Sequence, residues 1–212
     1  MSAVDIGALS AKVDTVTNRG VRQATAGSYT CTVTTTGWHL VRLQAGGGGG
    51  TSGGAKRGGS AGMYVEAEHW LVAGTTPAYT VGAGGAVGGT GGNSTFTGPN
   101  FTQTAYGGSA NLGTNGRLDD NVTDGAPAVD QTGGAIGGAH GNLPSANGGY
   151  SGCFKGSVGD ANGGGGGASR YAAGGAGGTT GTAGTFGSGG GGGTTGAAGG
   201  AGVFEIAFIG TN

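Results

Sequence analysis

The sequence predicts a mostly β protein with little helix, in which a small β-sandwich or collar clamps packed polyglycine-II helices. A short N-terminal α-helix precedes them. Glycine fills 60 of 212 positions, and it recurs at every third position from Gly175 to Gly202. A period of three is that of an extended left-handed helix without internal hydrogen bonds. The backbone groups of such helices must bond to neighbouring segments, and only glycine lets backbones approach so closely.

Two other classes share part of this pattern. Collagen has the same period but needs abundant proline, whereas this chain has 4 prolines, none of them between Gly175 and Gly202. Glycine-rich disorder is usually kept soluble by charge or proline, whereas only 9% of these residues are charged. Disorder therefore remains an alternative mainly for the free, unassembled chain.

The N-terminal segment predicts a short helix over residues 2–18. Ile6, Leu9, Val13 and Val16 follow heptad spacing, but two heptads are too short to be stable alone. We therefore expect residues 1–20 to be an attachment or oligomerisation segment. Packing of this helix on its own domain is the alternative. Residues 21–212 are expected to form one glycine-rich β/polyglycine-II domain.

Strands are predicted where apolar residues alternate with threonine and serine, as they do around Tyr29, Cys31 and Val33. Further strands are expected at residues 38–43, 63–72, 79–81 and 203–209. These segments must supply most of the hydrophobic stabilisation, because glycine has no side chain to bury. Glycine runs at residues 46–50 and 163–167 separate them from the periodic tract.

The periodic tract is too long to be one straight helix in a compact domain. At a rise of roughly 3.1 Å per residue, its 28 residues would extend about 87 Å. We expect it to fold back near residues 179–180 and 194–195, where pairs of threonine interrupt it.

Charge and cysteine content narrow the functional classes. The formal net charge is −1 and no basic run is present, so a nucleic-acid partner is not expected. Cys31 and Cys153 are compatible with a disulfide, but the absence of a secretory signal favours two thiols. No segment is long and apolar enough to be a predicted membrane span.

Matches to catalytic and metal motifs are attributable to composition. Two Gly-x-Ser-x-Gly matches, at residues 50–54 and 58–62, lack the strand–turn–helix context of a nucleophile. Residues 119–130 mimic part of a calcium loop, but Asp124 replaces its required glycine. We therefore expect no enzymatic activity, no metal and no cofactor.

The order of the segments resembles a known family. The motifs that carry the likeness are Gly-Ser-Tyr-Thr at 27–30, the glycine run at 46–50, Gly-Met-Tyr-Val-Glu at 62–66, Pro-Ala-Tyr-Thr-Val-Gly at 77–82, Asn-Ser-Thr-Phe at 93–96, and Gly-Gly-Ala-Gly-Val-Phe-Glu-Ile at 199–206. This resembles the glycine-rich domain of bacteriophage tail fibres and receptor-binding proteins. Stacked polyglycine-II helices of a related architecture occur in T-even phage tail-fibre adhesins. A distant glycine-rich domain occurs in the extracellular part of anaplastic lymphoma kinase.

The resemblance implies a virion protein, assembled in the host bacterial cytoplasm, that attaches the particle to a host glycan or outer-membrane protein. It also implies a homotrimer that contacts other virion proteins through its N-terminal segment. A head fibre, decoration or connecting protein without a receptor role is the alternative. Aromatic residues in polar loops suit recognition of a host surface, although they could instead plug the ends of the glycine stack. The candidate receptor-binding residues are Phe96, Phe101, Tyr106, Arg117, Tyr150 and Phe154.

Overall fold

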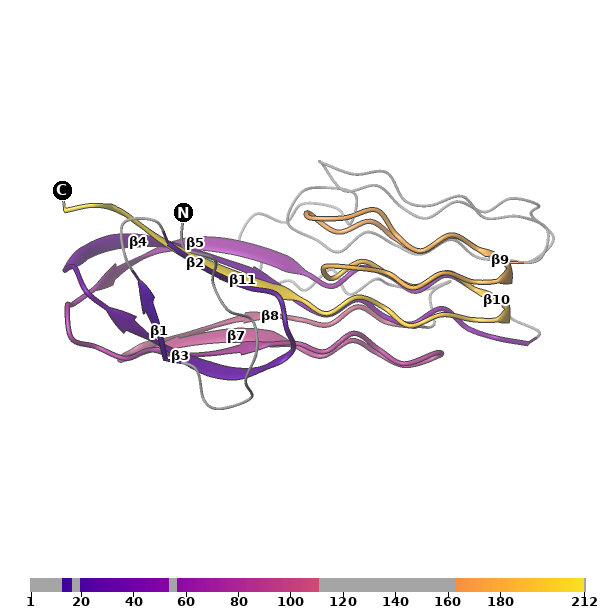
Figure 1. Ribbon diagram of the computed structural model, residues 1–212, viewed down its shortest axis with the longest axis horizontal. Helices are drawn as coiled ribbons and strands as arrows, with labels where there is room; N and C mark the ends of the chain where they lie inside the picture. Colours follow the sequence, from indigo (N-terminus) through magenta and orange to yellow (C-terminus); the bar gives the residue numbers. More distant parts are fainter. Residues whose placement is uncertain (1–12, 17–19, 54–56, 111–162, 212) are drawn as a thin grey trace, which may run out of the picture.

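The fold is mostly β, as the composition predicts. The computed structural model describes residues 13–16, 20–53, 57–110 and 163–211. In these residues the chain forms the strands β1 to β11 and no helix. Nine of these strands form two larger sheets, and extended glycine-rich segments continue from them along the long axis of the molecule (Figure 1).

The larger sheet has five strands in the order β1-β3-β6-β7-β8. Its pairs are antiparallel, except that β1 runs parallel to β3. Its strands are β1 (Val13–Val16), β3 (Gly27–Val33), β6 (Ala78–Val81), β7 (Ser94–Gly98) and β8 (Phe101–Ala105).

The second sheet has four antiparallel strands in the order β2-β11-β4-β5. Its strands are β2 (Val21–Gln23), β11 (Val203–Gly210), β4 (Gly37–Gln44) and β5 (Tyr64–Leu71). Figure 1 shows this sheet lying over the five-stranded one. Alternation of buried and exposed residues along β4 and β5 gives the four-stranded sheet an inner face and an outer face.

The hydrophobic core lies between the two sheets. Tyr79 of β6 stacks on Phe204 of β11 with ring centroids 3.8 Å apart, and Phe96 of β7 lies 5.8 Å from Phe204. All three side chains are at most 1% exposed. Both sheets contribute to one buried cluster, so the β-sandwich expected from the sequence is present.

Residues 13–16 form strand β1 and are not helical as the heptad spacing predicts. They pair in parallel with residues 30–33 of β3. The sequence Val-Asp-Thr-Val is rich in β-branched residues, which favour a strand when an unpaired sheet edge is available. Ile6 and Leu9 of the same predicted helix lie outside the described residues.

Residues 94–105 form the hairpin of β7 and β8, whereas the sequence interpretation places them in a loop. The turn lies at Pro99 and Asn100, two residue types that favour turns. Threonines alternate with larger residues on both sides of it, which is a strand signal. The hairpin therefore belongs to the five-stranded sheet and its inner side chains join the core.

Six strands of the sandwich continue directly into glycine-rich segments. Residues 45–51 follow β4, residues 82–87 follow β6 and residues 107–110 follow β8, while residues 57–63, 89–93 and 196–202 lead into β5, β7 and β11. Residues 163–178 and 181–193 extend beside them. We call these glycine-rich segments together the glycine bundle. It lies at one end of the sandwich, with its segments along the strand direction.

The backbone of residues 46–50 hydrogen-bonds in three directions in turn. The amides of Gly46 and Gly49 donate to residues 92 and 89, those of Gly47 and Gly50 to residues 200 and 197, and that of Gly48 to residue 60. The carbonyls of this run accept from residues 85, 88, 108 and 190. Three neighbouring segments therefore accept hydrogen bonds from this run and three others donate hydrogen bonds to it, so that six segments surround the run. Residues 189–193 repeat this pattern, with successive amides donating to residues 167, 48, 182, 164 and 51.

Glycine is required here because neighbouring backbone occupies every side of the run. A Cβ atom added at Gly47 would lie 2.8 Å from the Gly187 oxygen, and one at Gly49 would lie 2.6 Å from the Ala86 carbonyl carbon. Both separations are shorter than real Cβ contacts. Neither glycine has a positive φ angle. The constraint is therefore space, and conformational freedom does not enter.

The periodic tract folds back at both predicted positions. The Thr182 amide donates to the Ala176 carbonyl at 2.9 Å across the first reversal, and the Ala197 amide donates to the Gly191 carbonyl at 2.9 Å across the second. These reversals contain β9 (Gly178–Thr180) and β10 (Gly193–Thr195), which pair in parallel. A further reversal at Phe186 and Gly187, which the sequence interpretation does not include, is closed by the Ser188 amide donating to the Thr185 carbonyl.

Ser94 and Gln44 connect the sandwich to the glycine bundle. The buried Ser94 hydroxyl accepts from the Gly82 amide and donates to the Gln44 carbonyl, both at 2.9 Å. The Gln44 side-chain amide donates to the Gly62 carbonyl at 2.7 Å. Buried polar groups are costly without partners, so these bonds fix where strands end and glycine segments begin.

Candidate functional site

The described candidate receptor residues from the sequence mostly pack against the core. Phe96 is 0% exposed, so its side chain offers no surface to a ligand. Phe101 is partly buried and stacks on His69 with ring centroids 4.0 Å apart. Tyr106 also packs against the core cluster. Arg117, Tyr150 and Phe154 lie outside the described residues, as does Cys153, while Cys31 is buried in the core.

The end of the glycine bundle farthest from the sandwich is a cluster of turns, which we call the distal tip. It contains residues 51–53, 87–88, 179–180 and 194–195. The amide of Gly193 donates to the Thr51 carbonyl, that of Gly88 to the Gly50 carbonyl, and that of Gly181 to the Thr195 carbonyl, which hold these turns together. The threonines of β9 and β10 are exposed, and Val87 is 48% exposed. The turn residues of the described tip are therefore uncharged and rich in hydroxyl groups, and Arg57 adjoins them, because its amide donates to the Thr51 hydroxyl at 2.7 Å.

The opposite end of the molecule exposes two tryptophans. Trp38 of β4 and Trp70 of β5 are cross-strand partners whose rings meet edge to face, 5.7 Å apart. They are 37% and 46% exposed, and Ile209 of β11 and Val72, which directly follows β5, are also exposed. Because exposed aromatic groups often mark interaction surfaces, this end is a candidate contact face.

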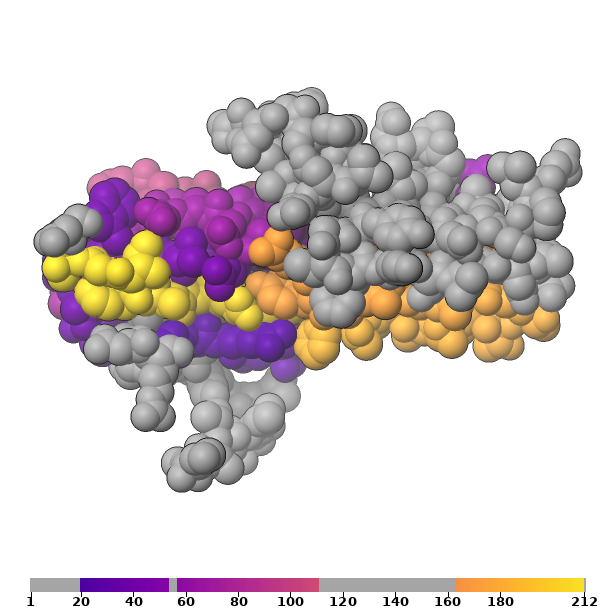
Figure 2. Space-filling model, turned by 90° about the horizontal axis from the view of Figure 1, so that it is seen from above, coloured from indigo at the N-terminus to yellow at the C-terminus, as the bar shows by residue number. Residues whose placement is uncertain are grey.

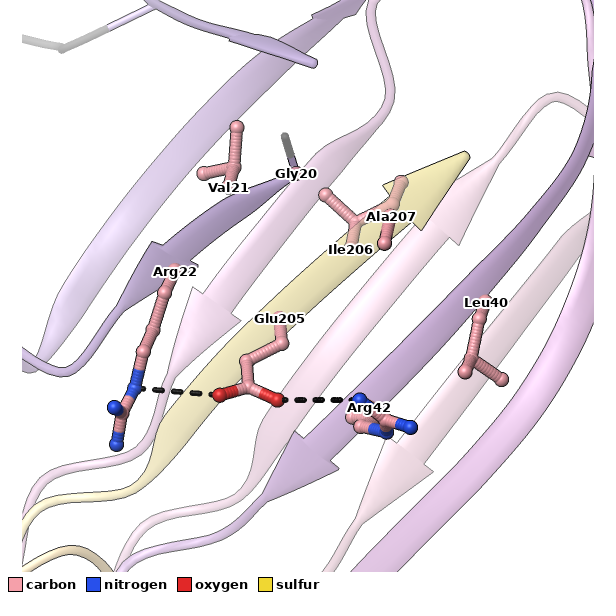
Figure 3. A pocket seen from close by; sticks show the side chains of 8 residues that line it. All are labelled: Gly20, Val21, Arg22, Leu40, Arg42, Glu205, Ile206 and Ala207. Carbon is pink, nitrogen blue, oxygen red and sulfur yellow. Dashed lines mark ion pairs between the residues drawn. The ribbon is translucent and has the colours of Figure 1, made fainter. Parts of the chain in front are cut away.

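A row of alternating charges crosses the outer face of the four-stranded sheet (Figure 3). Arg22 Nε lies 3.3 Å from Glu205 Oε1, and Arg42 Nη1 lies 3.7 Å from Glu205 Oε2. Arg42 Nε also pairs with Glu66. Each of the four strands supplies one member, because residues 22, 205, 42 and 66 are opposite one another in the strand register.

Aromatic residues from the glycine bundle border this row of charges. The Tyr171 hydroxyl donates to Glu205 Oε2 at 3.0 Å. The Arg22 guanidinium lies 5.4 Å from the Tyr171 ring centroid and 5.6 Å from that of Phe186. In Figure 2 the orange part of the bundle adjoins the exposed face formed by the indigo, purple and yellow strands. We call this junction of outer sheet face and bundle the ledge.

Phe186 has an unusual backbone conformation. Its φ angle is +46°, and it is the one residue other than glycine with a positive φ in the described chain. Residues other than glycine rarely adopt this backbone conformation, which costs of order 1–3 kcal/mol. The ring nevertheless remains 42% exposed. Backbone strain combined with an exposed ring makes Phe186 a functional candidate that no motif in the sequence indicates.

The ionisation states of the ledge follow from its contacts. The hydrogen bond from Arg42 holds the pKa of Glu66 below its usual value, and the Tyr64 hydroxyl adds a second bond that acts in the same direction. Burial raises the pKa of Tyr171, and the charge of Glu205 raises it further. At neutral pH, Glu66 is therefore a carboxylate and Tyr171 a neutral hydrogen-bond donor.

Other site types find no support among the residues that the structure describes. Within them, no three His, Cys, Asp or Glu side chains are grouped so as to hold a metal ion. The same residues contain no apolar helix of membrane-spanning length.

Comparison with known proteins supplies no family for this chain. No protein-family model matches it, and no curated protein matches it either.

Proposed function

We propose that this chain is a bacteriophage virion appendage protein, a tail-fibre tip or spike that attaches the particle to the host cell surface. In this proposal the glycine bundle is a stack of polyglycine-II helices clamped by the sandwich. The proposal combines the family resemblance of the sequence with the form of the described domain. It assigns the protein a binding role in the virion and no catalytic role.

The observation that carries the proposal is the hydrogen bonding of residues 46–50 in three directions. A run that donates to three neighbours and accepts from three others is fixed from all sides. Buried amides and carbonyls in such a stack cannot be separated without losing their partners. The result is a stiff rod with almost no side chains inside it. A stiff rod that carries loops at one end suits an external appendage.

The two ends of the molecule differ in a way that suits attachment. The sandwich end carries the exposed pair Trp38 and Trp70, and β11 ends there (Figure 1). We propose that this end, with the N-terminal segment, faces other virion proteins or copies of the chain. A homotrimer is the assembly that the resemblance implies. The distal tip then faces the host, where the receptor is a glycan or an outer-membrane protein.

A structural head fibre, decoration or connecting protein is the second candidate. The observation that favours it is the chemistry of the distal tip. Its described residues carry hydroxyl groups and Val87 but no aromatic side chain, and Arg57, the charged residue bonded to Thr51, is partly buried. Such a surface lacks the large rings that dominate binding energy at most protein interfaces. In this case the rod would act as a spacer.

Cell binding separates the two candidates. The labelled, purified chain is incubated with a panel of bacterial strains, and its ability to block phage adsorption is measured on strains that retain it. Heat-unfolded chain is the control for non-specific retention. An attachment protein binds susceptible strains and blocks adsorption. Failure in both assays on every strain infected by the virion that carries the protein would overturn the attachment role.

A matched pair of variants tests which end faces the host. Val87 at the distal tip and Val72 at the sandwich end are 48% and 51% exposed, so aspartate is accommodated equally at both. We expect Val87→Asp to weaken cell binding and Val72→Asp to leave it unchanged. The reverse result would show that the assigned orientation is wrong.

A further inference from the structure

We infer that the ledge is a binding site for an acidic saccharide. The site comprises Arg22, Arg42 and Glu205 on the sheet and Tyr171 and Phe186 on the glycine bundle. This inference goes beyond the function proposed above, because the ledge is a sugar site separate from the distal tip, and its biological meaning rests on the proposed attachment role. The chemistry of the site is argued from the described residues alone.

The outer face of the four-stranded sheet carries a hollow (Figure 3). It has a volume of about 320 Å³ and lies between β2, β11 and β4. Gly20 and Ala207 leave space there, while Arg22, Leu40 and Arg42 line it with longer side chains. Ligand sites in proteins usually measure roughly 300–1,000 Å³. The hollow is at the small end of that range, which suits a single sugar residue of a longer chain.

The two arginines that line the hollow have more N–H donors than their carboxylate partners use. A guanidinium group carries five N–H donors. Arg22 uses its Nε to pair with Glu205, and Arg42 uses Nε to pair with Glu66 and Nη1 to pair with Glu205. Both oxygens of Glu205 already accept bonds or ion pairs. The arginine side chains are 53% and 39% exposed. The remaining donors suit a carboxylate or phosphate group, which guanidinium binds in a two-pronged geometry.

Aromatic rings of the glycine bundle lie beside Arg22. Phe186 is the one aromatic residue between Gly175 and Gly202, and it sits on a strained backbone with its ring 42% exposed. Strain of this kind persists where the surroundings or a function require the side chain. A rigid ring beside hydrogen-bonding groups suits a sugar, because the sugar has an apolar C–H face and a polar edge.

The register of the sheet argues against an extended peptide as the ligand. Strand β11 is paired with β2 on one side and β4 on the other. Over residues 204–206, where β2 covers it, β11 therefore has no free edge to which a peptide strand could add, which is one common way that sheets bind peptides. Recognition in the hollow must come from side chains. The guanidinium groups of Arg22 and Arg42 line the hollow, whereas the Tyr171 and Phe186 rings lie beside Arg22, outside that lining. This arrangement matches a saccharide of more than one residue that carries an anionic group.

The test measures sugar binding to the purified full chain without cells. The probes are a glucuronic acid trisaccharide, the glucose trisaccharide of the same linkage, and glucose 6-phosphate, and binding is followed by isothermal calorimetry and saturation-transfer NMR. We expect the acidic trisaccharide to bind in the millimolar range or tighter and the neutral one not to bind. Binding of glucose 6-phosphate as well would support the same anion site with phosphate as a second source.

Three variants locate the site. Phe186→Gly removes the ring and relieves the positive φ, so we expect it to weaken acidic-sugar binding about tenfold while leaving the protein as stable or more stable. Arg22→Gln should weaken binding by about tenfold or more. Trp70→Ala, an exposed aromatic of the same sheet outside the ledge, should change nothing.

Several outcomes would overturn the inference. These are no binding at millimolar sugar, equal binding of the neutral trisaccharide, or unchanged binding in Phe186→Gly and Arg22→Gln. A large loss of stability in Phe186→Gly without loss of binding would show that the ring only fastens the bundle to the sheet. Sugar binding without cell binding would leave the ledge valid and remove the attachment function. Cell binding without sugar binding would support the attachment function and overturn the ledge as a sugar site.

Discussion

Adding one methyl group inside the glycine bundle is expected to be among the most damaging small changes to this protein. Gly49 lies in the central run, and its amide donates to the Gly89 carbonyl at 2.9 Å. In Gly49→Ala the new Cβ would lie 2.6 Å from the Ala86 carbonyl carbon and 3.0 Å from the Gly85 oxygen. Both atoms are backbone, so no side chain can rotate away, and the two segments must separate.

The magnitude follows from the contacts that such a separation breaks. Overpacking a rigid interior costs about 1–3 kcal/mol. Moving the segment also weakens two or three lateral backbone hydrogen bonds, at roughly 1 kcal/mol each. We therefore expect a loss of about 3–6 kcal/mol in the free energy of unfolding. For a chain of 212 residues, this corresponds to a fall in melting temperature of roughly 6–24 °C.

Gly89→Ala is the matched control, because it changes the residue on the other side of the same hydrogen bond. Its Cβ would meet the Ala86 oxygen at 3.1 Å, a contact that small shifts can absorb. We expect a change within about 1 kcal/mol, partly offset by the lower entropy of the unfolded alanine chain. Both variants are compared by denaturant unfolding followed by tryptophan fluorescence. Equal stability of Gly49→Ala and Gly89→Ala would refute the argument that backbone surrounds residue 49.

Three further predictions concern polar side chains. Burial lowers the pKa of His39 below 6.5; the unfolded chain therefore binds the proton more readily, and stability should fall as the pH drops below about 6.5 towards the folded pKa. In His39→Gln, the free energy of unfolding measured by pH-dependent denaturation should no longer fall with pH in this range. An unchanged pH dependence would show that another group causes the fall. Glu66 has a lowered pKa, so its ion pair with Arg42 stabilises the fold above about pH 4.5 and is lost as the pH falls through the lower folded value. Because both groups are exposed, Glu66→Gln should cost less than about 1 kcal/mol at pH 7 in urea unfolding, and nothing at acid pH. Ser94→Ala leaves two buried backbone groups without their side-chain partner, and should lower the free energy of unfolding by about 1–3 kcal/mol in the same assay. An unchanged free energy of unfolding would mean that water replaces the serine hydroxyl at this junction.

The sequence predicts the packed glycine runs, the chain reversals and strand β3, because each depends on a local residue pattern. A glycine at every third position, or a run of five, marks backbone that other backbone must approach, and residues 46–50 are surrounded in this way. The threonine pairs at 179–180 and 194–195 mark the reversals because they interrupt runs of small residues. The alternating pattern around Tyr29 likewise predicts β3.

The candidate site depends on contacts that no local pattern contains. Arg22, Arg42 and Glu205 are far apart in the sequence and meet because β11 pairs with both β2 and β4. In the sequence, Phe186 is one aromatic residue among small residues and has no distinguishing pattern. Only its φ angle and its distance to Arg22 mark it as a site residue. Phe96 resembles a loop aromatic in the sequence, but the hairpin of β7 and β8 turns it into the core.

The sequence by itself determined where side chains are excluded and where strands can form, because both depend on residue size and backbone preference. Only the tertiary structure decided which segments lie side by side. The choice of a strand at Val13–Val16 shows why: heptad spacing and β-branching favour different structures there. The edge offered by β3, a partner distant in the chain, settles the competition. Long-range pairing in the four-stranded sheet likewise brings Arg22, Glu205 and Arg42 together beside aromatic rings of the glycine bundle, and so creates the ledge.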